Sequence, residues 1–201
     1  MGHGGAAPPG TINVTDPDDD DGAHKSRAPI GLDAGSGGAH QDPPVPEATV
    51  GFAKRKLGHR VGDGECFALA DQALKAAKAF SAADFGTITD DADYIWGTQI
   101  QLGQLQAGDI IQFRDYRFDL KTTDEDGGWS TQFQERPHHT AVVETVGSDG
   151  AVTVLEQNAP KKSPVLRTTL YFQTTTFKRG SKTTEVTVQG TVWYYRPQKR
   201  S

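Results

Sequence analysis

Apolar residues at helical spacing characterise the first part of the region that begins near residue 48. Over residues 66–80 they recur every three or four positions among many alanines, which predicts a long amphipathic helix. A shorter stretch with the same spacing, residues 49–58, predicts a helix before it. Tyr94, Ile95 and Trp96 indicate one further short helix within an otherwise loop-like segment.

After residue 108 the pattern changes to short alternating or continuous apolar runs that are rich in β-branched and aromatic residues. Helices followed by a succession of strands with short connections predict an α+β fold, in which the helices pack on an antiparallel sheet of about five or six strands. The expected strands cover residues 109–113, 139–146, 151–158, 165–172, 185–188 and 191–195.

The apolar residues are unevenly distributed along the chain. Hydrophobic residues make up 35% of the sequence, below the roughly 45–50% of a typical globular chain. Residues 1–47 are rich in Gly, Pro, Ala, Asp and Ser and contain few residues that could build a core. We therefore predict a disordered tail over residues 1–47 and one folded domain over residues 48–198.

Charge and composition exclude some classes of partner. The net charge is −5 and no basic stretch is present, so nucleic acid is not an expected partner. No segment resembles a signal peptide of the general secretory (Sec) type or a membrane span, so we expect a soluble monomer. Its location stays open between the cell interior, the cell wall and delivery by another secretion route.

The single cysteine is the first residue with candidate chemistry. One cysteine excludes an intramolecular disulfide, and a lone cysteine is often a small buried apolar residue. Cys66, however, stands where a glycine-flanked loop meets the start of the best predicted helix. Free N–H groups and the positive end of the helix dipole stabilise a thiolate there. Cys66 is therefore a candidate nucleophile.

A nucleophilic thiol requires a base, and three histidines lie outside the predicted tail: His59, His138 and His139. Side chains alternate along a strand, so His139 shares the apolar face with Ala141 and Val143, whereas His138 points to the other face. His139 is therefore the inward histidine and the candidate base.

A predicted hairpin brings polar side chains near His139. If residues 147–150 form a two-residue turn, His139 lies opposite Asn158 and Ala141 lies opposite Glu156. Inward polar side chains are costly without partners, which indicates a bonded network or a site. A cysteine, a histidine and a group that orients the histidine are the components of thiol-dependent acyl transfer.

Four sequence fragments together resemble the CHAP branch of the NlpC/P60-type cysteine peptidases. The similarity extends over roughly residues 50–197, and its fragments are residues 64–66, 107–113, 139–143 and 156–158. The resemblance implies a papain-like fold and an amidase or endopeptidase that acts on bacterial peptidoglycan peptides. It implies Cys66 as nucleophile, His139 as base, and Glu156 with Asn158 as orienting groups.

Two further residues are expected to contact the substrate. Glu65 stands directly before Cys66, where members of the resembled family often have Gln. Trp129 lies in a polar insertion, residues 114–138, that is expected to form a hairpin beside the cleft. That hairpin either borders the cleft and contacts the substrate, or it only projects from the surface.

The expected activity is therefore thiol-dependent hydrolysis of an amide bond without a cofactor. No metal is predicted, because Asp63 and Glu65 alone do not supply the six or more oxygen ligands that calcium requires. Two alternatives stay open. One is a non-catalytic module that binds cell wall or glycan, and the other is an effector-type deamidase or acyltransferase that acts on a protein.

The assignment of the base generates a prediction that separates two adjacent histidines. His139→Ala should abolish amide hydrolysis, whereas His138→Ala should retain most of it, because only His139 faces inward. Initial rates of the two purified variants on one substrate provide the measurement. The opposite ranking would mean that the strand register is shifted by one residue.

Overall fold

The computed structural model describes residues 42–201. The predicted disordered tail therefore lies almost entirely outside the described residues. The first helix, α1 (Val45–Arg55), begins ahead of the expected domain start at residue 48. Pro46 in its first turn and the acidic Glu47 both favour a helix start at this point.

The second helix, α2 (Cys66–Ala76), begins where the sequence predicted and ends earlier. Lys78 adopts a positive φ of 56°, and the N–H of Ala79 donates back to the carbonyl of Leu74. This is the hydrogen bonding of a left-handed helix cap, which ends the helix before residue 80. Two short 3-10 helices follow, η1 (Ala82–Asp84) and η2 (Leu102–Gln104).

The helix expected at residues 94–96 is wrong, because this segment is not helical. Tyr94 and Trp96 are buried, whereas Ile95 between them is 46% exposed. Neighbouring residues that face opposite ways are typical of an extended chain. Both buried rings pack against Phe67 at the start of α2, with ring centroids 5.0 and 5.2 Å away.

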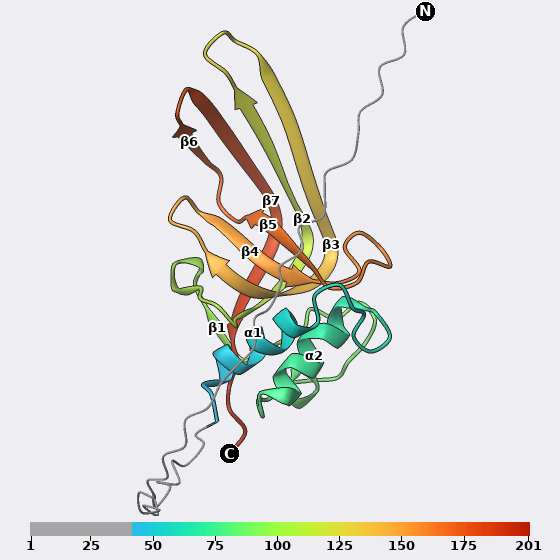
Figure 1. Cartoon of the computed structure of the whole chain (residues 1–201). Helices are drawn as coiled ribbons and strands as arrows, with labels where there is room; N and C mark the ends of the chain where they lie inside the picture. Colours follow the sequence, from blue (N-terminus) through green and yellow to red (C-terminus); the bar gives the residue numbers. More distant parts are fainter. Residues whose placement is uncertain (1–41) are drawn as a thin grey trace, which may run out of the picture. The chain divides into compact units, whose positions relative to one another are not determined.

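The rest of the described chain forms one seven-stranded antiparallel sheet with the order β1-β7-β2-β3-β4-β5, in which β6 also pairs with β7 (Figure 1). An α+β fold is therefore confirmed, with more strands than expected. The strands are β1 (Thr98–Ile100), β2 (Ile110–Thr123), β3 (Trp129–Val146), β4 (Ala151–Glu156), β5 (Leu166–Tyr171), β6 (Thr175–Arg179) and β7 (Lys182–Arg196).

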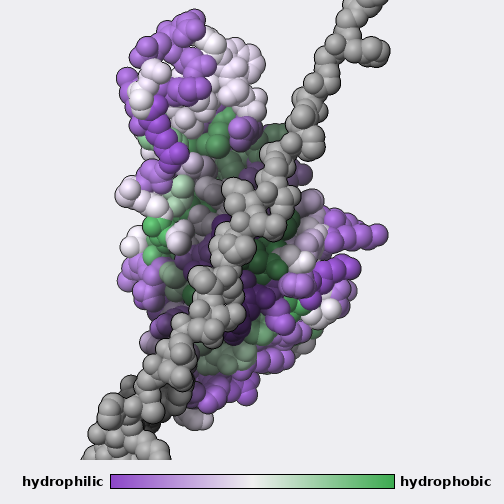
Figure 2. All heavy atoms as spheres, in the orientation of Figure 1, coloured by the Kyte–Doolittle hydropathy of each residue, from purple (hydrophilic) through white to green (hydrophobic). Residues whose placement is uncertain are grey.

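Two expected features become parts of longer strands. The insertion at residues 114–138 is a hairpin, as predicted, formed by the continuation of β2 and β3. The two strands expected at residues 185–188 and 191–195 are one strand, β7, with Gly190 between them. Figure 1 shows the β2–β3 and β6–β7 hairpins projecting away from the helices, and Figure 2 shows mainly hydrophilic residues at their far end.

The sheet buries side chains on both faces. One core cluster lies between the sheet and the two helices and includes Leu69, Leu74 and Val142. The second lies on the other face and includes Phe113 and Leu170. Among the described helices, none is long and apolar enough to cross a membrane.

A kink divides the central strands into a half covered by helices and a projecting half. The pairing of β2 with β7 shifts register between Arg114 and Arg117. At this bulge Asp115 has a φ of 53° and Gly190 a φ of 90°. A Cβ atom at Gly190 would lie 2.2 Å from the carbonyl oxygen of Asp115, so the strands approach too closely there for a side chain.

The β3–β4 hairpin has the predicted register near the site but not the predicted turn. Val142 pairs with Leu155, and Val143 with Val154, as expected. Closer to the turn the register is shifted by one residue, because the N–H of Gly147 donates to the carbonyl of Ala151 and the connecting loop is longer than expected. A bulge after Val143 absorbs the extra residue, so the two deviations cancel at the site end of the hairpin.

The close approach at Gly190 predicts a large effect of adding one methyl group. Gly190→Ala should lower the free energy of unfolding by on the order of 3 kcal/mol, because overlap with Asp115 adds to backbone strain. Gly180→Ala is the matched control, since Gly180 also has a positive φ but has open space around it. We expect it to cost only about 1–2 kcal/mol. Urea unfolding of both variants provides the measurement, and equal losses would contradict the steric argument.

Candidate active site

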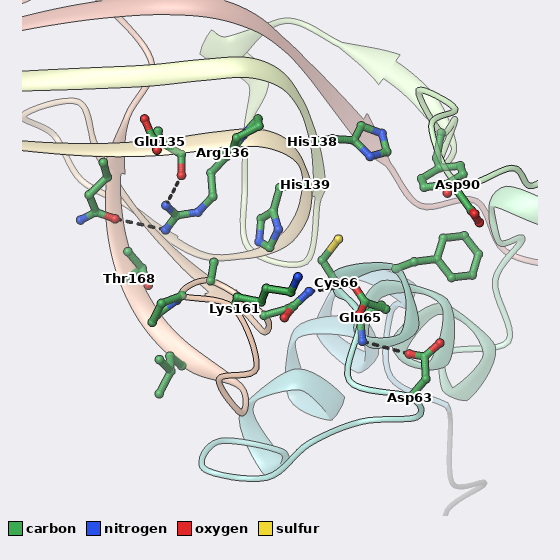
Figure 3. Close-up of a pocket in the computed structure, with 18 of the residues that line it drawn as sticks. Asp63, Glu65, Cys66, Asp90, Glu135, Arg136, His138, His139, Lys161 and Thr168 are labelled. Carbon is green, nitrogen blue, oxygen red and sulfur yellow. Dashed lines mark hydrogen bonds between the residues drawn. The ribbon is translucent and has the colours of Figure 1, made fainter.

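Three of the predicted site residues meet at the point where α2 begins. Cys66 is the first residue of α2, His139 lies on β3, and Glu156 is the last residue of β4. Figure 3 shows the imidazole of His139 between Cys66 and Arg136. His139 is 5% exposed and Glu156 is fully buried, so their charges interact with little screening by water.

His139 lies between the thiol and the carboxylate. Its Nε2 atom is 3.0 Å from Oε2 of Glu156. The N–H of this nitrogen is not directed at the carboxylate, so the contact is electrostatic rather than an aligned hydrogen bond. Burial lowers the pKa of His139, but the contacts with Cys66 and Glu156 outweigh burial and raise it to about 9. The imidazole is therefore protonated at neutral pH.

The pKa of the Cys66 thiol shifts in the opposite direction to that of His139. Burial raises the pKa of Cys66, whereas hydrogen bonding to His139 and the charge of the imidazolium lower it. Main-chain hydrogen bonds from Thr140 and Phe67 lower it further, and the pKa ends below its ordinary value. A lowered thiol pKa beside a raised imidazole pKa favours a thiolate–imidazolium pair.

Arg136 is a site residue that the sequence reasoning missed. Its Nε donates to Oε2 of Glu156 at 2.8 Å and its Nη2 donates to Oε1 at 2.5 Å. Burial raises the pKa of Glu156, but Arg136 and His139 outweigh burial and lower it to about 2. The signal that could have revealed Arg136 is the predicted inward carboxylate of Glu156 beside a histidine. A buried negative charge requires a positive partner.

Gln157 is a second missed residue, and it holds the loop before the nucleophile. Its Oε1 accepts the N–H of Val61 at 2.9 Å, and its Nε2 donates to the carbonyls of Val61 at 2.9 Å and Glu65 at 2.6 Å. Gln157 is fully buried. These bonds fix the start of α2 to the end of β4, which are the elements that carry Cys66 and Glu156.

Asn158 does not lie opposite His139, so its predicted orienting position is wrong. Strand β4 ends at Glu156, and Asn158 turns away with a φ of 63°. Its Nδ2 donates to the Glu65 carboxylate at 2.7 Å, and its Oδ1 accepts the N–H of Lys162 at 2.6 Å. Asn158 therefore holds the exposed side chain of Glu65 at the edge of the site.

Trp129 is also far from its expected place beside the cleft. It is 68% exposed and pairs with Thr123 at the far end of the β2–β3 hairpin. His139 is ten positions further along β3, about 33 Å at the usual rise of a strand. The hairpin leads away from Cys66, and Trp129 does not line the cleft, so Trp129 is not part of the site.

His138 lies on the opposite face from His139, as strand alternation predicted. Its Nε2 is 2.8 Å from the carbonyl oxygen of Ala92, and its ring packs beside Tyr94. Nearby, Oε1 of buried Gln112 accepts hydrogen bonds from Trp96 and from Thr140. This network positions the stretch of β3 that carries His139.

Cys66 and His139 open into a cleft of about 1040 Å³. Its walls carry acidic residues, Asp63, Glu65, Asp90 and Glu135, and basic residues, Arg136, Lys161 and Arg167 (Figure 3). Within residues 42–201, no three His, Cys, Asp or Glu side chains converge as metal ligands would. The thiol of Cys66, the imidazole of His139 and the charged walls are the reactive and polar groups that line this cleft.

A comparison with protein families identifies the fold. The model of the AIM3/BBC1 cysteine proteinase-fold domain matches residues 44–201. The chain belongs to this family. No curated protein and no solved structure matches the chain. The AIM3/BBC1 match supports the papain-like fold expected from the sequence, and it does not assign the chain to the CHAP or NlpC/P60 families.

In this AIM3/BBC1 domain, a thiol, an imidazole and a carboxylate follow one another in the order that acyl transfer requires. The imidazole lies within reach of the sulfur, and the carboxylate fixes its protonated form. The cysteine proteinase fold of the AIM3/BBC1 family is therefore accompanied here by side chains that match such chemistry.

The lowered thiol pKa in this AIM3/BBC1 domain predicts a measurable reactivity. The rate of Cys66 alkylation by iodoacetamide follows the thiolate fraction, so its inflection should fall clearly below the roughly pH 8.5 of a free thiol. His139→Ala removes the imidazolium and should move the inflection upward. Mass spectrometry of the alkylated protein across pH provides the rates. An inflection at the same pH in the wild type and in His139→Ala would show that His139 does not cause the lowered pKa of Cys66.

Proposed function

We propose that this domain hydrolyses amide bonds in peptides through a thioester on Cys66. The observation that carries the proposal is the series Cys66, His139, Glu156 and Arg136: the partly buried thiol lines the cleft, and the fully buried Glu156 contacts both His139 and Arg136. With the thiolate–imidazolium pair formed, all four groups are charged, and burying charges is costly unless they are paired. A catalytic role would explain why the domain keeps these charged side chains together next to a cleft.

In the first step, the thiolate of Cys66 attacks the carbonyl carbon of the amide and forms a carbon–sulfur bond. The imidazolium of His139 gives its proton to the nitrogen, the carbon–nitrogen bond breaks, and an amine leaves. The N–H of Cys66 belongs to the first turn of α2, where N–H groups have no acceptor within the helix. It is the donor that we propose for the developing oxyanion.

In the second step, water replaces the amine. The now neutral imidazole of His139 takes a proton from the water, whose oxygen attacks the thioester carbon. The carbon–sulfur bond breaks, a carboxylic acid is released, and Cys66 and His139 return to their starting charges. Glu156 stays ionised throughout, since Arg136 neutralises it from the other side.

The substrate class that fits the cleft is a peptide. Charged groups of both signs line its walls, which suits a chain with varied side chains. The sequence resemblance implied peptidoglycan peptides in particular, and the AIM3/BBC1 match carries no information about a cell wall. Both an unfolded protein and peptidoglycan peptides are therefore included in the test.

The proposal predicts release of new amines by the full chain from labelled casein or from soluble peptidoglycan peptides. Cys66→Ser should abolish the release, and Trp129→Ser should leave it unchanged because Trp129 lies outside the cleft. The rate should rise with pH as the thiolate forms, and fall above about pH 9 as His139 loses its proton.

Absence of amine release from every substrate, together with fast alkylation of Cys66, would overturn hydrolysis and favour the non-catalytic binding module. Equal activity of the wild type and Cys66→Ser would show that a different group or a contaminant is responsible. Muropeptide mass analysis of the peptidoglycan arm would separate an amidase from an endopeptidase.

A further inference from the structure

A second hollow continues the cleft along the projecting hairpin. It has a volume of about 270 Å³ and is lined by Phe118 and Leu120 of β2, Phe133 of β3 and Tyr171 of β5. Gln134 lines both this hollow and the cleft that holds Cys66. The two depressions therefore adjoin and form one groove between β3 and β5.

The wall of this groove on β3 is a sheet edge. Strand β3 pairs with β2 from Trp129 to Val142, but its pairing with β4 begins only at Val142. Within the part of the chain that the structure describes, no strand occupies the other side of β3 before Val142. An unpaired strand edge presents N–H and C=O groups to which an extended chain can bond.

The free edge leads directly to the nucleophile. Residues 134–139 of this unpaired stretch line the same cleft as Cys66. The backbone of a chain that lies along this edge of β3 would therefore pass next to the thiolate of Cys66. His139 belongs to the same stretch of β3 and lines the cleft together with Cys66.

We infer that the groove binds an extended polypeptide by strand addition to β3, with an apolar side chain in the hollow and the amide to be cleaved at Cys66. The inference rests on the proposed function and specifies its substrate as an unfolded protein segment. Main-chain bonds would supply affinity and the hollow would supply specificity, the usual division in strand addition.

The dimensions determine which substrate residue the hollow would select. Phe133 and His139 are six positions apart on β3, about 20 Å at the usual rise of a strand. The apolar side chain should therefore stand about six residues from the cleaved bond. The hollow is smaller than the roughly 300–1,000 Å³ of a pocket for a drug-sized molecule, and its size fits one large apolar side chain.

The first test maps cleavage sites in casein by mass spectrometry. Wild-type sites should be enriched in Leu, Phe or Met about six residues from the cleaved bond, on one side only. Phe133→Ser should abolish this enrichment. Trp129→Ser is the matched control, since Trp129 is an exposed aromatic residue on the same strand and outside the groove. It should keep the enrichment.

The second test measures binding without turnover. The full chain with Cys66→Ala is mixed with labelled casein peptides of about 15 residues, long enough to span the roughly 20 Å between the thiolate and the hollow. Peptides with an apolar residue should bind, and N-methylation of every second amide should weaken binding at least tenfold in one of the two alternating sets. Phe133→Ser should weaken binding similarly.

The two tests distinguish the failure of each idea. Binding with the expected N-methyl pattern but no cleavage by the wild type would support the groove and overturn the proposed hydrolysis. Cleavage without positional enrichment, or binding that is insensitive to N-methylation and to Phe133→Ser, would overturn strand addition and leave the hydrolysis standing. Equal effects of Phe133→Ser and Trp129→Ser would also overturn it.

Discussion

The buried carboxylate of Glu156 is the constraint on which the candidate site depends. A fully buried charge is tolerated only with close partners, and loss of one partner of such a pair typically costs about 3–5 kcal/mol. Arg136 bonds both of its oxygens, and His139 stands against one of them. The middle of β3 and the end of β4 must therefore meet with these side chains together, which also sets the position of the imidazole beside Cys66.

The features that local patterns govern could be predicted from the sequence. Helical spacing located the start of α2 at Cys66, and strand alternation placed His138 and His139 on opposite faces. The juxtaposition of His139 and Glu156 also follows from alternation within one hairpin. It was predicted with a wrong turn, and the prediction held because the bulge after Val143 restores the register.

The features that depend on distant parts of the chain could not be predicted in this way. Arg136 reaches Glu156 because β3 continues far beyond the site, and no local pattern shows how far a strand extends. Gln157 bonds a loop more than ninety residues away in the sequence. The positions of Trp129 and Asn158 were wrong for the same reason, since each depended on where a strand ends.

The place of β7 in the sheet has a consequence for how the protein is made. This strand, residues 182–196, lies between β1 and β2, so a strand late in the sequence occupies the interior of the sheet. While the ribosome is still synthesising the earlier residues, β2 has an open edge and β1 has no partner. Pairing over such long separations is slow and exposes incomplete sheets to aggregation. In this strand order, β1 and β2 therefore acquire their shared partner only after residue 196 has been synthesised.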